Sequence, residues 1–350
     1  MASLLRSHYP WTSVPFVVSA PMMKITLARF AVAVSKAGGL GFVAGGFDLS
    51  GLGKDMDEAA ELLKSSSIQS RSGVLPVGIG FQNWGSDINL AMPVIKKHRP
   101  AAVWFFAPHQ PSDLLPWAKE TRAATDGQTK IWVQVGTVAE AMEVAKTTKP
   151  DVIVLQGSDA GGHGLQQRAS IISLLPEVSS AFARAGIEIP LIAAGGIGDG
   201  RGAAAALTLG ASGVALGTRF LAAEEATIAK GYQNEVLRVS DGGVSTVKTR
   251  LYDTVRGTAD WPPAYDGRAV ANRSYLDALH GMSDKENQEL YKEAVKLGDD
   301  GWGPEGRMTT YAGTSVGLVD KVLPAQEIVK DVQEGALKAL ETTARRFQQE

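Results

Sequence analysis

Eight short apolar runs, each followed by glycine or proline and then by a helical pattern, constrain the fold of this chain more than any other feature. They are PFVVSAPM (15–22), GLGFVAGG (39–46), VLPVGIGF (74–81), AAVWFFAP (101–108), KIWVQVG (130–136), DVIVLQG (151–157), IPLIAAGG (189–196) and SGVALGT (212–218). Runs without polar alternation are typical of parallel strands covered on both faces. Eight such units predict an α/β fold of the (β/α)8 TIM-barrel type. A doubly wound sheet is the alternative, but SAPMMKIT, after the first run, carries no dinucleotide-binding fingerprint.

The helical patterns between the runs support the barrel, and the pattern changes after the eighth run. Helices are predicted at Pro111–Ala124, Thr137–Thr148, Ile171–Ala185 and Gly202–Gly210. We expect residues 1–222 plus 307–350 to form the barrel and residues 223–306, which are polar and rich in helical pattern, to form a mostly helical insertion beside its mouth. Pro324–Phe347 predicts a closing helix, with Ile328, Val329, Val332, Ala336, Leu337 and Leu340 at helical spacing.

Composition excludes several classes of function. The chain has 350 residues, of which 44% are hydrophobic and 21% charged, as in soluble globular proteins. The net charge of −2 gives no excess of positive charge that would indicate binding to nucleic acid or to an anionic membrane. No apolar run is long enough for a membrane helix. The absence of cysteine excludes disulfides and thiolate metal sites, and the five histidines show no metal-ligand spacing, so no metal site is predicted.

The sequence constrains the cellular location and the oligomeric state of the protein only weakly. The first residues lack the apolar core of a signal peptide, so we expect a cytoplasmic protein. Arg6 and several serines leave organelle targeting open. The sequence does not decide between a monomer and a homodimer.

Glycine-rich segments follow the seventh and eighth runs, AAGGIGDGRG (193–202) and ALGTRF (215–220). At the carboxyl ends of barrel strands, such segments present backbone amides at the starts of the following helices, where they bind phosphate. We therefore expect a phosphate-bearing ligand, and flavin mononucleotide (FMN) has a suitable size. The alternative is that these glycines only permit tight turns.

Two further strand ends offer candidate contacts. In SAPMM, Pro21 holds the backbone extended after Ala20, and a flat apolar ring could rest against Met22. A simple strand terminator is the alternative. Gln134 is polar within an otherwise apolar strand, so it either hydrogen-bonds a neighbouring strand or reaches a ligand.

His163 is the main catalytic candidate. In DVIVLQGSDAGGHG (151–164) a predicted strand leads into a segment that we expect to be a flexible polar loop on the catalytic face. A histidine there can accept a proton or, once protonated, hold an anion; capping the next helix is the alternative. His109, after the fourth run, is a secondary candidate. We expect His98 to be solvated, and His8 and His280 to be surface or packing residues.

The segments GSDAGGHG, IAAGGIGDGRGAAAALTLGASGVALGTRFLAAEEA, SAPM, AGGLGFVAGG, DWPPAYDGRAVANRS and YAGTSVGL resemble the nitronate monooxygenases, formerly 2-nitropropane dioxygenases. The resemblance implies an FMN-binding barrel with His163 at the reactive edge of the flavin. It places the phosphate on Gly195, Gly196, Gly217 and Thr218, beside Ala194. It also implies that Ala20, Pro21, Met22 and Gln134 line the ring system, that Gly161 and Gly162 pack close to it, and that Tyr311, Gly313, Thr314 and Ser315 close the site. Relatives often have glutamine where this chain has Thr314.

The implied reaction is oxidation of an alkyl nitronate by O2 to a carbonyl compound and nitrite, with propionate 3-nitronate as one candidate substrate. Flavin-dependent enoyl reductases and NADH:quinone reductases share the motifs around strands six and seven, so an NAD(P)H-dependent reductase is the alternative. Trp261, Tyr265 and Arg268 could line either kind of pocket. A flavin- or phosphate-binding barrel without turnover is a further alternative, which leaves His163 without a purpose. The preferred nitronate and the acceptance of neutral nitroalkanes stay open.

Overall fold

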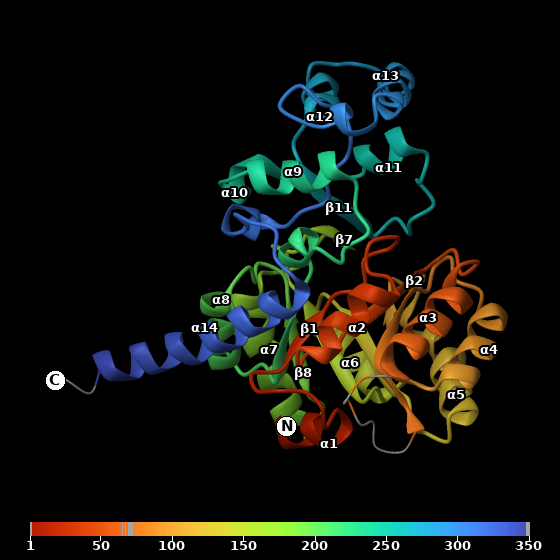
Figure 1. Cartoon of the computed structure of the whole chain (residues 1–350), viewed down its shortest axis with the longest axis vertical. Helices are drawn as coiled ribbons and strands as arrows, with labels where there is room; N and C mark the ends of the chain where they lie inside the picture. Colours follow the sequence, from red (N-terminus) through yellow and green to blue (C-terminus); the bar gives the residue numbers. More distant parts are fainter. Residues whose placement is uncertain (1, 65, 67, 69–72, 348–350) are drawn as a thin grey trace.

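The computed structural model in Figure 1 describes residues 2–64, 66, 68 and 73–347. Met1 and residues 348–350, which belong to the predicted barrel unit, lie outside the described residues. The barrel strands are β1 (Val17–Ser19), β2 (Phe42–Gly46), β3 (Leu75–Gln82), β4 (Pro100–Phe106), β5 (Lys130–Val135), β6 (Val152–Gln156), β8 (Leu191–Ala194) and β9 (Gly213–Leu216). One strand lies in each of the eight predicted runs.

These strands form one parallel sheet that closes on itself. Its order is β1-β9-β8-β6-β5-β4-β3-β2, and every neighbouring pair is parallel. The circle closes where Val18 bridges Leu40, just before β2: the Leu40 amide donates to the Val17 carbonyl over 3.0 Å, and the Ser19 amide donates to the Leu40 carbonyl over 3.1 Å. The predicted (β/α)8 barrel is confirmed.

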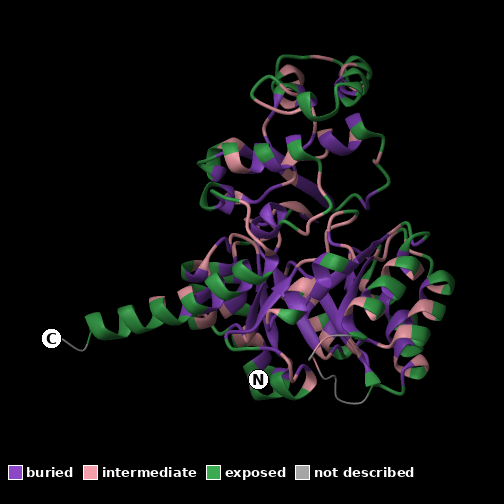
Figure 2. Cartoon of the chain, in the orientation of Figure 1, coloured by how far each residue is buried: buried purple, intermediate pink, exposed green. Residues whose placement is uncertain are grey.

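Helices surround the barrel and turn their buried faces toward the strands (Figure 2). They are α1 (Ala2–His8), α2 (Ala28–Lys36), α3 (Leu52–Lys64), α4 (Ile88–His98), α5 (Leu114–Ala124), α6 (Val138–Lys146), α7 (Ile171–Ala185), α8 (Gly200–Thr208) and α14 (Ala325–Arg346). The α7 helix has the bounds that its periodicity predicts. It begins where the Ser170 side chain accepts a hydrogen bond from the Ile172 amide and ends at Gly186, whose φ is 64°.

Aromatic side chains close the amino end of the barrel. Phe42, Trp104 and Trp132 are buried inside it, and Tyr9, which follows α1, covers them from below. The Trp132 indole donates to the Tyr9 hydroxyl over 2.7 Å. Because this end is filled, space for a ligand remains at the carboxyl ends of the strands, where barrel enzymes carry their active sites.

A second layer lies over that carboxyl end (Figure 1). It contains α9 (Lys230–Arg238), α10 (Gly242–Ser245), β10 (Thr246–Thr249), α11 (Leu251–Arg256), β11 (Tyr265–Val270), α12 (Arg273–Leu279) and α13 (Asp284–Lys296). Short 3-10 helices occur at η2 (Pro111–Asp113), η3 (Thr218–Ala222), η4 (Gly298–Gly301) and η5 (Thr314–Leu318). The predicted insertion thus contains two strands besides its helices; the predicted domain boundaries stay a prediction.

The segment after β6 differs from the expectation of a flexible loop, which was wrong. Gly162–Leu165 forms β7, and β7 pairs antiparallel with β11 in a three-stranded sheet of order β10-β11-β7. His163 lies opposite Gly267 in this register. The histidine is therefore held by a strand ladder that joins the barrel segment to the insertion.

The closing helix α14 divides into two halves. Ile328, Val332 and Ala336 are buried, and the helix packs against α8 and α2. Leu337 is 51% exposed and Leu340 36% exposed, where α14 extends away from the body (Figure 2). The predicted apolar stripe is therefore buried only in its first half. In the described part of the chain, no helix is long and apolar enough to cross a membrane.

Candidate active site

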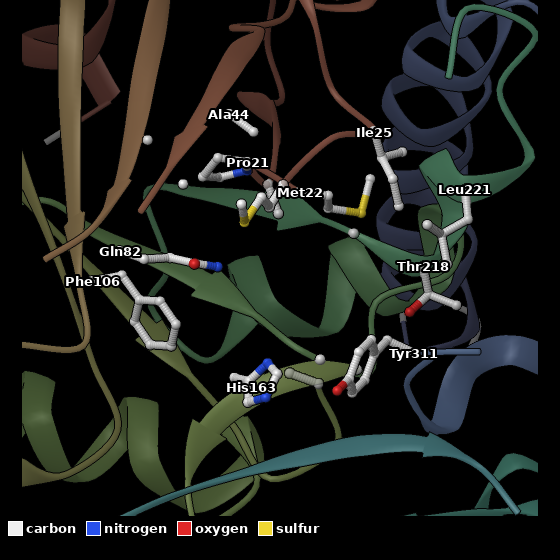
Figure 3. A pocket seen from close by; sticks show the side chains of 18 of the residues that line it. Pro21, Met22, Ile25, Ala44, Gln82, Phe106, His163, Thr218, Leu221 and Tyr311 are labelled. Carbon is white, nitrogen blue, oxygen red and sulfur yellow. The ribbon is translucent and has the colours of Figure 1, made fainter. Parts of the chain in front are cut away.

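A cavity of about 450 Å³ lies between the carboxyl ends of the barrel strands and the layer above them (Figure 3). This volume is in the range of small-molecule sites in proteins. Its walls contain most of the residues that the sequence singles out: Ala20, Pro21, Met22, Gln134, Gly161, Gly162, His163, Ala194, Gly195, Gly196, Gly217, Thr218, Tyr311 and Ser315. Residues far apart in the sequence thus meet around one space.

Two of the predicted residues lie behind the wall. The Gly313 amide donates to the Thr218 hydroxyl oxygen over 2.9 Å, so Gly313 supports a wall residue. Thr314 borders a shallower depression that shares Gly196 and Ser315 with the cavity, and its hydroxyl donates to Asp159 Oδ1 over 3.3 Å.

The turn after β8 presents backbone amides to the cavity wall. Gly195 and Gly196 have φ values of 105° and 75°, which residues with side chains rarely adopt. Within the described residues, the amides of Gly195, Gly196 and Gly217 donate to no protein acceptor. This is the arrangement that binds a phosphate group through backbone N–H groups.

The sequence predicts that the start of α8 presents free backbone amides to a phosphate, and the structure differs. The Asp199 side chain caps this helix and accepts from the amides of Arg201 and Gly202. Two amides at the start of α8 are therefore satisfied by a carboxylate, and the residues of this helix are not among those that line the cavity. The segment after β9 agrees better with the expectation, because η3 begins at Thr218 on the cavity wall.

Three glutamines on barrel strands add polar side chains to the cavity wall. The Gln82 side chain, at the end of β3, points into the cavity (Figure 3), and among the described residues its buried Oε1 has no hydrogen-bond partner. The Gln156 amide donates to the His163 carbonyl over 2.9 Å. Gln134 Oε1 accepts from the Trp104 indole over 2.9 Å, so Gln134 bonds a neighbouring strand and also lines the cavity. Sequence analysis missed Gln82 and Gln156, although each is a polar residue at the end of an apolar run.

His163 is in contact with the insertion on two sides. Its ring stacks on Trp261, with centroids 3.8 Å apart and planes 5° from parallel. Its Nε2 atom lies 2.8 Å from Oδ1 of Asp253, on α11. The His163 side chain is 10% exposed and the Asp253 side chain 2% exposed. Gly267 makes room for this arrangement, because a Cβ there would lie 2.8 Å from the Tyr311 ring and 3.5 Å from His163 Nε2.

Tyr311 and Arg256 extend the hydrogen-bond chain. The Tyr311 hydroxyl donates to Asp253 Oδ1 over 3.0 Å, and the Arg256 guanidinium donates to the Tyr311 oxygen over 3.2 Å. Burial, and then the nearby Asp253 carboxylate, raise the pKa of Tyr311 well above its usual value. Tyr311 therefore keeps its proton and serves as a donor.

The loop that carries Trp261 is anchored by one arginine. The Arg250 guanidinium donates to the carbonyls of Ala259, Trp261, Pro262 and Tyr265. The α11 helix is anchored by the Tyr252 hydroxyl, which donates to the Val270 carbonyl of β11 over 2.6 Å. Sequence analysis singled out neither Asp253 nor Arg250, because no local pattern places α11 beside β7.

Four other residues discussed in the sequence analysis do not line the cavity. His109 is exposed and lies outside the cavity wall. His98 is not solvated as expected: its side chain is 6% exposed and lies 3.1 Å from Asp57. Tyr265 packs against Phe106 and Trp261, and Arg268 donates to the Ser158 carbonyl, so both support the wall from behind.

The closed barrel, the cavity at the carboxyl ends of its strands and the histidine on the cavity wall define a (β/α)8-barrel enzyme. The family model for nitronate monooxygenase matches residues 92–335. The chain is 51% identical over 337 residues to "Nitronate monooxygenase npaC" of Metarhizium robertsii, covering 95% of this chain and 94% of that protein. It is 39% identical to a nitronate monooxygenase of Neurospora crassa, covering 95% and 92%. This chain belongs to the nitronate monooxygenase family and is an oxidoreductase.

A solved structure supports the fold independently. The nitroalkane oxidase of Streptomyces ansochromogenes superposes with a TM-score of 0.73 at 23% identity, covering 96% of this chain and 99% of that one.

Proposed function

We propose that this protein binds FMN in the cavity and oxidises alkyl nitronates with O2 to a carbonyl compound and nitrite. Family membership supports the reaction class. The observation that carries the proposal is the position of His163: it is the histidine on the cavity wall, and it is held by Trp261 and Asp253.

The cavity residues fit a flavin mononucleotide. The free amides of Gly195, Gly196 and Gly217 suit its phosphate, and the wall there adjoins the open depression at Ser315, so the charged group keeps contact with water. The unpartnered Gln82 Oε1 suits a ring N–H donor, and Met22 and Pro21 suit the flat ring. Bound flavin supplies the redox chemistry that amino-acid side chains lack.

In this proposal His163 handles the proton and the charge of the substrate. A neutral imidazole accepts a proton from a nitroalkane, which is a carbon acid, and the imidazolium that results binds the nitronate anion. The apolar side chains around it, including Trp261 and Phe106, exclude water and strengthen this electrostatic contact.

Two cations at the cavity edge favour substrates with a second negative charge. Arg256 and Lys24 both line the cavity, and both are exposed to solvent at its outer side. A carboxylate-bearing nitronate such as propionate 3-nitronate would place its nitronate at His163 and its carboxylate toward these cations. We therefore propose this substrate class over alkyl nitronates that lack a second charged group.

Oxygen uptake by the purified yellow protein tests the proposal, with an alkyl nitronate, propionate 3-nitronate or NAD(P)H as the electron donor. We expect rapid uptake and nitrite release with nitronates and no NAD(P)H oxidation. With a neutral nitroalkane as the substrate, His163→Gln should lower turnover by about 10²- to 10⁴-fold, the usual contribution of a general base, while retaining flavin. His109→Gln, outside the cavity, is the matched control. NAD(P)H oxidation with an inert nitronate would instead identify a reductase.

A further inference from the structure

We propose that Asp253 is a positioning residue that holds His163 in one tautomer, with the proton on Nε2 and the Nδ1 lone pair available to the cavity. The proposal rests on the contact between His163 Nε2 and Asp253 Oδ1, 2.8 Å apart. It deepens the proposed function, because it specifies which nitrogen of His163 would meet a substrate.

The direction of each hydrogen bond follows from its neighbour. Arg256 has only donors, so the Tyr311 oxygen accepts from it and the Tyr311 proton is directed to Asp253 Oδ1. Asp253 Oδ1 thus accepts from Tyr311, and as a carboxylate oxygen it also accepts from His163. Nε2 must therefore carry a proton in the neutral ring as well as in the charged ring.

The remaining ring nitrogen is the reactive one. With Nε2 committed to Asp253, Nδ1 is the atom of neutral His163 that can accept a proton, and the ring lies on the cavity wall (Figure 3). Trp261 stacks on the ring face, so rotation that would exchange the two nitrogens is opposed by both the stack and the hydrogen bond. After proton transfer, the buried carboxylate balances the imidazolium charge.

The Asp253 carboxylate is not needed to hold the insertion on the barrel. The β7–β11 ladder already joins the two parts through four residue pairs, and Arg250 and Tyr252 anchor the insertion loop and α11. Asp253 instead places a 2% exposed carboxylate against a ring on the cavity wall. Burying a charge is costly unless it is paired, so the arrangement is maintained by its partners.

Nitrogen NMR of ¹⁵N-histidine-labelled protein tests the proposal without relying on turnover. The chain has five histidines, and the spectrum of His163→Gln assigns the His163 signals. Spectra are recorded as the pH is raised until the His163 signals stop changing, and we then expect wild-type His163 to show a protonated Nε2 and an unprotonated Nδ1. A proton on Nδ1 would overturn the proposal, whether or not the protein oxidises nitronates.

Two nearly isosteric variants identify the responsible atom. Asp253→Asn retains an acceptor oxygen and should keep the Nε2–H tautomer, whereas Asp253→Leu removes the acceptor and should give averaged signals from both tautomers. If Asp253→Leu keeps the wild-type tautomer, the proposal is wrong. Asp260→Asn, an exposed carboxylate in the same insertion, is the control.

Turnover adds a second measurement on flavin-loaded protein. With a neutral nitroalkane as the substrate, loss of the acceptor should lower turnover on the order of 100-fold, the lower range for general-base catalysis, with partial recovery in Asp253→Asn. Equal loss in both variants at full flavin content would contradict a role for the acceptor oxygen. An inactive wild-type protein with the expected tautomer would refute the proposed function and leave the Asp253–His163 pairing intact.

Discussion

The two walls of the cavity are built on different principles. The barrel wall consists of strand ends and glycine turns, so it offers backbone amides and apolar surface. The opposite wall comes from the insertion, from β7 and from the segment at Tyr311 that pairs with β11, and it offers side chains in a hydrogen-bond chain: Arg256, Tyr311, Asp253 and His163. Under the proposed function, the barrel wall would hold the cofactor and the opposite wall would position the histidine. Variants on the barrel wall should therefore change flavin binding, whereas variants on the opposite wall should change turnover.

The largest expected effect is on the barrel wall. Gly196→Val places a Cβ 3.0 Å from the Asp159 side chain at a residue whose φ is 75°, so the turn must rearrange. We expect protein purified without yellow colour and without measurable turnover. Absorbance of the purified protein and flavin titration measure this. Gly53→Ala, where a Cβ meets no neighbouring atom within 4 Å, is the control. Normal flavin binding by Gly196→Val would remove the barrel wall from the cofactor site.

A substitution on the insertion wall should lower turnover without changing the flavin content. Trp261→Leu removes the ring that stacks on His163 at 3.8 Å. Aromatic stacking contributes about 0.5–1.5 kcal/mol beyond buried area, which corresponds to a decrease of roughly 2- to 13-fold in kcat. Steady-state oxygen uptake and the flavin spectrum measure the two quantities separately. Loss of flavin in this variant would contradict the division of labour between the walls.

The floor of the barrel should affect stability alone. Tyr9→Phe removes the acceptor of the Trp132 indole, which is buried and donates to it over 2.7 Å. A buried donor without a partner costs about 1–3 kcal/mol. We expect the free energy of unfolding in urea to fall by this amount, with kcat unchanged in the folded enzyme. A large change in kcat would show that the floor and the cavity are coupled.

The smallest expected effect is a pH dependence of protein stability. It arises at His98, which is not part of either wall. Burial lowers the pKa of His98 below its ordinary value. The unfolded chain therefore binds this proton at a higher pH than the folded protein does. Stability that is present above about pH 6.5 should decrease as the pH falls below that value. Urea midpoints should fall less on acidification in His98→Gln than in wild type, and His280→Gln, an exposed site, should follow wild type.

Much of the fold follows from local pattern. Apolar runs without alternation indicate strands buried on both faces, and the Ser170 cap and Gly186 bound α7 at its predicted ends. Because parallel strand ends meet at one end of a barrel, the residues after these runs had to approach one another. This reasoning brings Ala20, Gly195, Gly217 and His163 to one cavity without any knowledge of side-chain contacts.

The environment of His163 was decided by tertiary structure. Its strand partner is 104 positions away at Gly267, and Asp253 is 90 positions away on a six-residue helix. Neither is marked by periodicity, because β7 is only four residues long and glycine-rich, which resembles a loop in sequence. The capping of α8 has a local cause, because aspartate is a residue type that accepts hydrogen bonds from the first amides of a helix. Local sequence determined the barrel and its glycine turns because these depend on short-range backbone and burial preferences, whereas the histidine's partners depend on long-range pairing that only the folded chain brings together.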